Sequence, residues 1–123
     1  MAKKNLQKEN TQELTDCIIE AMQDKMAKDI CTINFSKIPN MVAKYFVICH
    51  AESPPQMEAI ADAIERKVKT VLKMRPWSSE GYENKEWILL DYVDVVVHIF
   101  REERRFFYNI EALWADAEIK KIS

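Results

Sequence analysis

The stretch from Trp87 to Phe100 constrains the fold of this chain more than any other segment. Its fourteen residues carry only two charged side chains, those of Asp91 and Asp94. This length is too short to cross a bilayer and too long for a typical β-strand. Because the two aspartates interrupt the apolar run near its middle, the stretch predicts two strands joined by a turn.

The segments before this hairpin predict one helix and two strands. Asn10, with Glu13 three residues later, has the pattern of a capping box at the start of a helix. Residues 29–35 alternate and are rich in β-branched side chains, which favours a first strand. Residues 44–50 form an almost continuous apolar run, typical of a central strand that is covered on both faces.

A second long helix follows the second predicted strand. Ser53 has the chemistry of an N-cap, Pro54 suits the first helical position, and Gln56 completes a capping box. Pro76 marks the end of this segment. Its exposed side carries two acid-before-base pairs at the i,i+4 spacing that favours ion pairs, Asp62 with Arg66 and Glu65 with Lys69.

The remainder predicts a short strand near residues 80–82, the hairpin, and a last helix over residues 103–117. Five apolar residues share one face of that helix: Phe106, Ile110, Leu113, Trp114 and Ala117. The order helix, strand, strand, helix, strands, helix predicts one α/β domain with a mixed sheet and helices packed on it. We place this domain at residues 10–118, between a flexible N-terminus at residues 1–9 and a C-terminal tail at residues 119–123.

Composition excludes several classes of site. The chain has a single glycine, Gly81. A dinucleotide-binding loop needs three glycines and a P-loop needs two, so neither fits. Two histidines and three cysteines without a Cys-x-x-Cys pair predict no zinc site. We therefore expect no cofactor, and we interpret the cysteines as small buried thiols in a reducing cytoplasm.

The charge balance points away from nucleic acid. Eighteen basic and twenty acidic side chains give a net charge of −2, without a broad basic footprint. A slightly acidic chain suits a basic protein partner better. The N-terminal residues are polar and do not have the apolar segment of a secretory signal. We also expect no membrane partner.

The two faces of the predicted hairpin differ in chemistry. With Tyr92 and Val93 at the turn, Asp91 lies opposite Asp94, Leu89 opposite Val96, and Trp87 opposite His98, all on one face. The other face is aliphatic and must be core: Ile88, Leu90, Val95, Val97 and Ile99. The mixed face is the candidate for binding. The alternative is that Trp87 and His98 pack under a helix while both aspartates lie in a solvated turn.

Two other functions stay open at this level. Asp91 and Asp94 could hold Mg²⁺ for nucleotidyl transfer, although such sites usually add a third carboxylate and a phosphate-binding loop. The exposed sheet face could instead pair with a second copy of the chain and form a homodimer.

Three blocks of residues extend this interpretation across about residues 11–117. The first joins Tyr45–Cys49 to Ser53 and Ile60–Asp62, the second joins Glu80–Gly81 to Trp87–Tyr92 and Asp94–Phe100, and the third contains Arg105, Tyr108, Glu111, Leu113 and Trp114. Together they resemble the ribosomal silencing factor family, the RsfS or Iojap-related proteins.

The resemblance implies a fold and a function. The fold is α/β, related in topology to nucleotidyltransferases but without a working active site, so no enzyme is expected. The function is binding of the large ribosomal subunit through its conserved β-barrel protein, number fourteen in the large-subunit series. Bound there, such a factor blocks joining of the small subunit and represses translation when nutrients are short. Carried onto this chain, the expected contact residues are Trp87, Asp91, Tyr92, Asp94 and His98, with Glu80 and Tyr82 behind them.

The chain departs from the family pattern at three positions. Lys44 stands where the family usually has Asp, and Ala51 and Val93 stand where it often has Gly. A β-branched residue tolerates a positive φ poorly, so Val93 predicts a wider turn or a shifted hairpin register.

Overall fold

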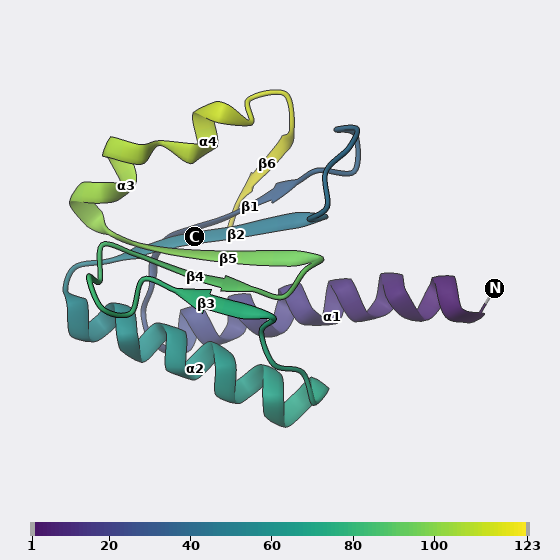
Figure 1. The fold of residues 1–123 in the computed structure, drawn as a ribbon, viewed down its shortest axis with the longest axis horizontal. Helices are drawn as coiled ribbons and strands as arrows, with labels where there is room; N and C mark the ends of the chain where they lie inside the picture. The colour runs from purple at the N-terminus through teal and green to yellow at the C-terminus, as the bar shows by residue number, and fades with distance from the viewer. Residues whose placement is uncertain (1, 123) are drawn as a thin grey trace.

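The chain folds into two helical layers on either side of one sheet. A computed structural model describes the backbone of residues 2–122 and the side chains of residues 11–122. Figure 1 shows the arrangement. In chain order the elements are α1 (Ala2–Asp24), β1 (Lys28–Asn34), β2 (Tyr45–Ala51), α2 (Pro54–Leu72), β3 (Ser78–Glu80), β4 (Trp87–Asp91), β5 (Val95–Arg101), α3 (Glu102–Tyr108), α4 (Ile110–Leu113) and β6 (Glu118–Lys121).

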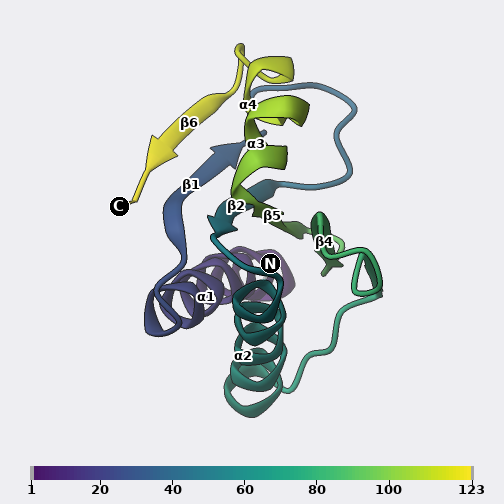
Figure 2. The same cartoon turned by 90° about the vertical axis from the view of Figure 1, so that its left-hand side faces the viewer.

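The sheet has six strands in the order β3-β4-β5-β2-β1-β6. Strands β2 and β5 pair in parallel, and the other neighbours are antiparallel. The mixed α/β architecture expected from the sequence is confirmed, and β2 is central as expected. Figure 2 shows α1 and α2 side by side on one face, and α3 and α4 over β2 and β5 on the other. No helix in the described part of the chain is long and apolar enough to span a membrane.

The face toward α1 and α2 holds the larger core. All five hairpin residues assigned to the aliphatic face are fully buried there. They pack with one stripe from each helix, whose central members are Ile18 and Met22 in α1 and Ile60 and Ile64 in α2. Burying aliphatic side chains contributes about 1.5–3 kcal/mol each, so this layer supplies much of the stability of the fold.

The start of α2 matches its sequence pattern. Ser53 has an extended backbone, and its hydroxyl accepts a hydrogen bond from the Gln56 backbone N–H at 3.3 Å. The Gln56 side chain accepts from the Glu52 backbone N–H and donates to the carbonyls of Lys25 and Met26. One side chain therefore caps α2 and ties it to the loop that follows α1.

Three expectations about the chain ends are wrong. Helix α1 begins at Ala2 rather than at Asn10, which lies inside it. The last helix is broken because Asn109 adopts the left-handed conformation at φ 44°, separating α3 from the short α4. As a result Phe106 and Leu113 are exposed rather than buried. Residues 119–121, expected in a tail, belong to β6 and pair with β1. The flexible N-terminus at residues 1–9 stays a prediction, since the side chains there lie outside the described residues.

Gly81 should tolerate no larger side chain. Its φ is +93°, and a Cβ there would overlap the carbonyl oxygen of Trp87 in the adjacent strand. The atoms that this Cβ would meet, in Trp87 and Ile88, all belong to the backbone, so Gly81→Ala requires β3 and β4 to separate. We expect a loss of at least about 2 kcal/mol in the free energy of unfolding, measured by urea denaturation. Ser79→Ala, on the same exposed edge strand, is the control and should stay within about 0.5 kcal/mol of the parent. Equal stability of the two variants would contradict this account.

Candidate functional site

The two hairpin strands are joined by a wider turn than the register predicted from the sequence. Trp87 lies opposite Phe100, Leu89 opposite His98, and Asp91 opposite Val96, so each residue pairs two positions further along than expected. Val93 adopts φ +72°, and its backbone N–H donates to Asp91 Oδ1 at 2.7 Å. Because the shift is an even number of residues, every strand side chain keeps its expected face.

The face away from α1 and α2 stays partly uncovered at the β3–β4 edge. The register aligns Glu80, Leu89 and His98 in one cross-strand row, and Ser78, Asp91 and Val96 in the next. Helix α3 packs against β2 and β5, so the parts of these rows on β3 and β4 lie beside the helix and are not covered by it. We name the accessible set the open face: Glu80, Trp87, Leu89, Asp91 and Val96, of which Glu80 is exposed and the others are half-buried.

Trp87 is held rigidly on this face. Its ring stacks on Phe100 with centroids 4.9 Å apart and contacts Tyr108 of α3 at the same separation. Its indole Nε1–H donates to Nδ1 of His98 at 3.0 Å. The alternative stated above, in which Trp87 and His98 pack under a helix, is therefore partly correct. Trp87 contacts α3, but its indole is only half-buried.

His98 is a buried neutral partner rather than an exposed contact. Its side chain is 4 % exposed and packs on Phe46, with ring centroids 4.4 Å apart. Burial lowers the pKa of His98 to about 3. Because the indole can only donate, Nδ1 accepts and the ring proton resides on Nε2. His98 thus fixes the indole of Trp87 without carrying charge.

This buried histidine predicts an acid-sensitive fold. An unfolded histidine gains its proton near pH 6.5, whereas folded His98 gains it only near pH 3. The unfolded chain therefore binds more protons as the pH falls through this window. The free energy of unfolding should fall by about 1.4 kcal/mol per pH unit from His98 alone. Burial and the adjacent Arg105 also lower the pKa of His50, which adds a decrease of the same sign.

Urea denaturation between pH 7 and pH 4 measures this dependence. His98→Gln should be less stable than the parent at pH 7, because it disrupts the packing around Trp87. Its stability should nevertheless decline less steeply as the pH falls, since one proton-linked group is gone. Identical slopes in the parent and the variant would contradict the assignment.

The other expected contact residues lie on the opposite side of the sheet. Tyr92 is 4 % exposed and packs in the core beneath α1 and α2. The Tyr82 hydroxyl donates to Glu65 of α2 at 2.6 Å. Asp94 Oδ2 lies 3.5 Å from the Thr11 hydroxyl of α1, and its backbone carbonyl accepts from the backbone N–H groups of Lys44 and Tyr45. Of the seven residues expected at the site, the structure brings Glu80, Trp87 and Asp91 onto the open face.

Sequence reasoning missed two strongly exposed apolar residues beside this face. Trp77 and Val42 are each 80 % exposed. Both line a hollow of about 400 Å³ with Asp91, Val93 and Val96. The Trp77 backbone N–H donates to the Asp91 carbonyl at 2.6 Å, which fixes the position of this residue. The sequence feature that could have identified Trp77 is the presence of a tryptophan in an otherwise polar connection.

The two aspartates considered for a metal site have separate partners. Asp91 caps the hairpin turn, while Asp94 lies against α1. Among the described residues, no group of three or more His, Cys, Asp or Glu side chains could hold a metal ion. The three cysteines are free and buried, as expected, and burial raises the pKa of Cys49 to about 12.

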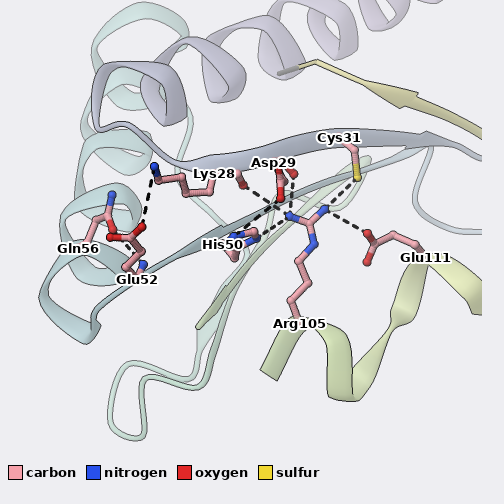
Figure 3. Close-up of polar contacts among 8 residues, drawn as sticks. All are labelled: Lys28, Asp29, Cys31, His50, Glu52, Gln56, Arg105 and Glu111. Atoms are coloured by element: carbon pink, nitrogen blue, oxygen red, sulfur yellow. Dashed lines mark hydrogen bonds and ion pairs between the residues drawn. The ribbon is translucent and has the colours of Figure 1, made fainter. Parts of the chain in front are cut away.

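Helix α3 is anchored over the sheet by the buried side chain of Arg105. As Figure 3 shows, its guanidinium reaches the backbone and side chains of β1 and β2. Nη1 donates to the Asp29 carbonyl at 2.7 Å and to His50 Nδ1 at 2.9 Å. Nη2 donates to Glu111 at 3.1 Å and contacts Cys31 Sγ at 3.6 Å. By fixing the position of α3, Arg105 determines which part of the sheet the helix covers and which part remains as the open face.

Comparison with known proteins finds extended similarity over most of the chain. The sequence profile of the family described as "Ribosomal silencing factor during starvation" matches residues 8–123. A protein of Halalkalibacterium halodurans named ribosomal silencing factor RsfS is 39 % identical over 108 residues, covering 88 % of this chain and 91 % of its own. The protein of the same name from Bacillus subtilis is 41 % identical over 103 residues, covering 80 % and 82 % respectively. The crystal structure of a Chromobacterium violaceum protein, 36 % identical, superposes with a TM-score of 0.79 over 85 % of each chain.

Proposed function

The chain belongs to the ribosomal silencing factor family, and on that premise we propose that it represses translation by covering a protein of the large ribosomal subunit. The proposed partner is the β-barrel protein number fourteen in the large-subunit series. The contact is made through the open face. Occupancy of that surface excludes the small subunit by volume, and the chain acts in the cytoplasm, where the subunits meet.

The observation that carries this proposal is the chemistry of the open face. The half-buried indole of Trp87 and the aliphatic side chains of Leu89 and Val96 supply apolar contact area. Glu80 and Asp91 place carboxylates around them. Tryptophan is favoured at the centre of protein interfaces, and acidic side chains complement a basic ribosomal protein and speed encounter.

The buried members of the expected site support this surface from behind. His98 holds the Trp87 indole, and Asp94 fixes the hairpin turn through its backbone carbonyl. Tyr92 and Tyr82 pack the same hairpin and the β3–β4 loop against the core. We assign these four residues a positioning role and give direct contact to Glu80, Trp87 and Asp91, joined by Leu89 and Val96.

Steric exclusion requires affinity and position rather than bond chemistry. A non-enzymatic role agrees with the names of the relatives, which describe silencing factors. Because both partners keep their covalent structure, repression should be reversible on dilution and should follow occupancy of the large subunit.

Direct titration tests the proposed contact. The purified chain should bind the purified β-barrel protein with one-to-one stoichiometry by isothermal titration calorimetry. The affinity should weaken as salt is raised from about 50 mM to 300 mM, because part of the attraction is between unlike charges. Absence of binding at low salt would reject this partner.

A further inference from the structure

Four cations at the end of α2 have no partner within the described part of the chain. Arg66, Lys69, Lys73 and Arg75 are exposed, and none forms an ion pair or a side-chain hydrogen bond there. The i,i+4 pairs expected with Asp62 and Glu65 are not formed. Glu65 instead accepts a hydrogen bond from the Tyr82 hydroxyl at 2.6 Å.

Their isolation contrasts with the neighbouring Lys67. That lysine turns toward α1 and forms ion pairs with Glu20 at 2.9 Å and Asp24 at 3.4 Å. Ordinary charge pairing therefore operates on the inner side of α2. The outer side keeps its positive charge available for a ligand.

Three of these cations border a hollow that also contains an exposed aromatic ring. The hollow measures about 620 Å³ and is lined by Arg66, Lys69, Arg75, Trp77 and the edge strand residues Ser78 and Ser79. Trp77 is 80 % exposed. Asp62 and Glu65 also line the hollow and offset part of the positive charge, while Lys73 lies outside its lining.

We propose that this surface, the α2-end surface of Arg66, Lys69, Lys73, Arg75 and Trp77, binds a short single-stranded RNA segment. Guanidinium and ammonium groups neutralise successive phosphates, and an exposed indole offers a flat platform for a base. A purely acidic peptide such as hexaglutamate would use the cations but offers no ring to stack on Trp77. The net charge of −2 on the whole chain does not reveal this local surface, where the four cations outnumber the two neighbouring carboxylates, Asp62 and Glu65.

The α2-end surface goes beyond the proposed protein contact. That contact uses the open face of the sheet, whereas the cations project from α2 on the other side of it. Trp77 lines both this hollow and the one beside Asp91, so it lies where the two surfaces meet.

Fluorescence anisotropy with a labelled oligouridylate of about twelve nucleotides tests the inference in the absence of ribosomes. The parent chain should bind it, and the slope of log K against log salt should be about −2 to −3, as expected for three to four phosphate contacts on a single strand. Arg66→Glu with Lys69→Glu should lower the affinity at least tenfold and make the slope shallower. The matched control, Lys120→Glu with Lys121→Glu, reverses two exposed charges at the opposite edge of the sheet and should stay within twofold.

Aromatic substitutions at Trp77 provide a second readout. Trp77→Ala should weaken oligouridylate binding about tenfold at constant salt slope, and Trp77→Phe should restore most of it, because stacking needs a ring but not an indole N–H. The inference is overturned if the parent does not bind, or if the Arg66/Lys69 variant binds as tightly as the parent. It is also overturned if hexaglutamate binds this surface while the RNA does not. Failure of this inference is distinguishable from failure of the proposed protein contact, because the Arg66/Lys69 variant changes no residue of the open face and should bind the β-barrel protein like the parent.

Discussion

The variant carrying Leu89→Arg and Asp91→Lys should lose co-sedimentation with large ribosomal subunits. Leu89 lies in the cross-strand row with Glu80, and Asp91 lies in the next row beside Val96. The change removes apolar contact area and would place two cations against the proposed basic partner. Desolvated like charges at an interface cost several kcal/mol, so we expect affinity to fall at least about 100-fold. Gradient sedimentation with quantitative immunoblotting measures the bound fraction.

A matched variant separates this surface effect from a general charge effect. Met26→Arg with Glu13→Lys makes the same change in net charge on exposed positions away from the open face, and it should co-sediment like the parent. Asp91→Asn keeps the hydrogen bond that caps the turn but removes the carboxylate charge, so its affinity should fall about tenfold or less. If the Leu89/Asp91 variant sediments like the control, the open face is not the contact surface.

Replacing Arg105 with methionine should cause the largest loss of stability outside the aliphatic core. The guanidinium is 6 % exposed and serves two backbone carbonyls, His50, Cys31 and Glu111 at once. Methionine fills similar space but leaves these acceptors without donors. Breaking a buried charged network by removing one partner costs about 3–5 kcal/mol, and chemical denaturation should report a loss in that range.

Neighbouring Arg104 is the control for this substitution. It is half-buried and pairs with Glu86 at 3.1 Å, close to the surface. Arg104→Met should cost about 1 kcal/mol or less. Arg105→Lys keeps the positive charge without the planar donor fork, so it should lie between the two methionine variants. An Arg105→Met variant as stable as Arg104→Met would show that the network does not anchor α3.

Strong local patterns allowed much of the fold to be predicted. The apolar run at residues 45–49 is long and uninterrupted, and it forms the central strand β2. Ser53, Pro54 and Gln56 act within one turn of helix, so their capping role can be predicted without knowledge of tertiary contacts. The aliphatic face of the hairpin was also correct, because the register differs from the expected one by two residues and an even shift leaves every side chain on its face.

Features set by distant contacts could not be predicted in the same way. The periodicity of the last helix continues through Asn109, yet the backbone turns left-handed there and the Arg105 network holds α3 in place. Strand β6 lies at the sheet edge with all four residues exposed, so it has no alternation of buried and exposed side chains to reveal it. The two-residue change in hairpin register depends on a positive φ at Val93, which propensity disfavours.

The candidate site shows the same division. Trp87 and Asp91 were predicted on the correct face, because the face of a strand residue depends only on whether the register shift is odd or even. Tyr92 and Asp94 belong to the turn, where alternation no longer applies, and both turn toward the α1 side. The proximity of Trp77 to Asp91 depends on the pairing of β3 with β4, which connects residues separated by a long loop.

A subunit-joining assay measures whether the bound chain keeps the two ribosomal subunits apart. Purified large subunits are incubated with the chain, small subunits are then added, and joined ribosomes are quantified by sucrose-gradient sedimentation. Joining should fall in proportion to occupancy of the large subunit, and the Leu89/Asp91 variant should leave joining unchanged. Undiminished joining on large subunits that demonstrably carry the chain would contradict the proposed steric exclusion.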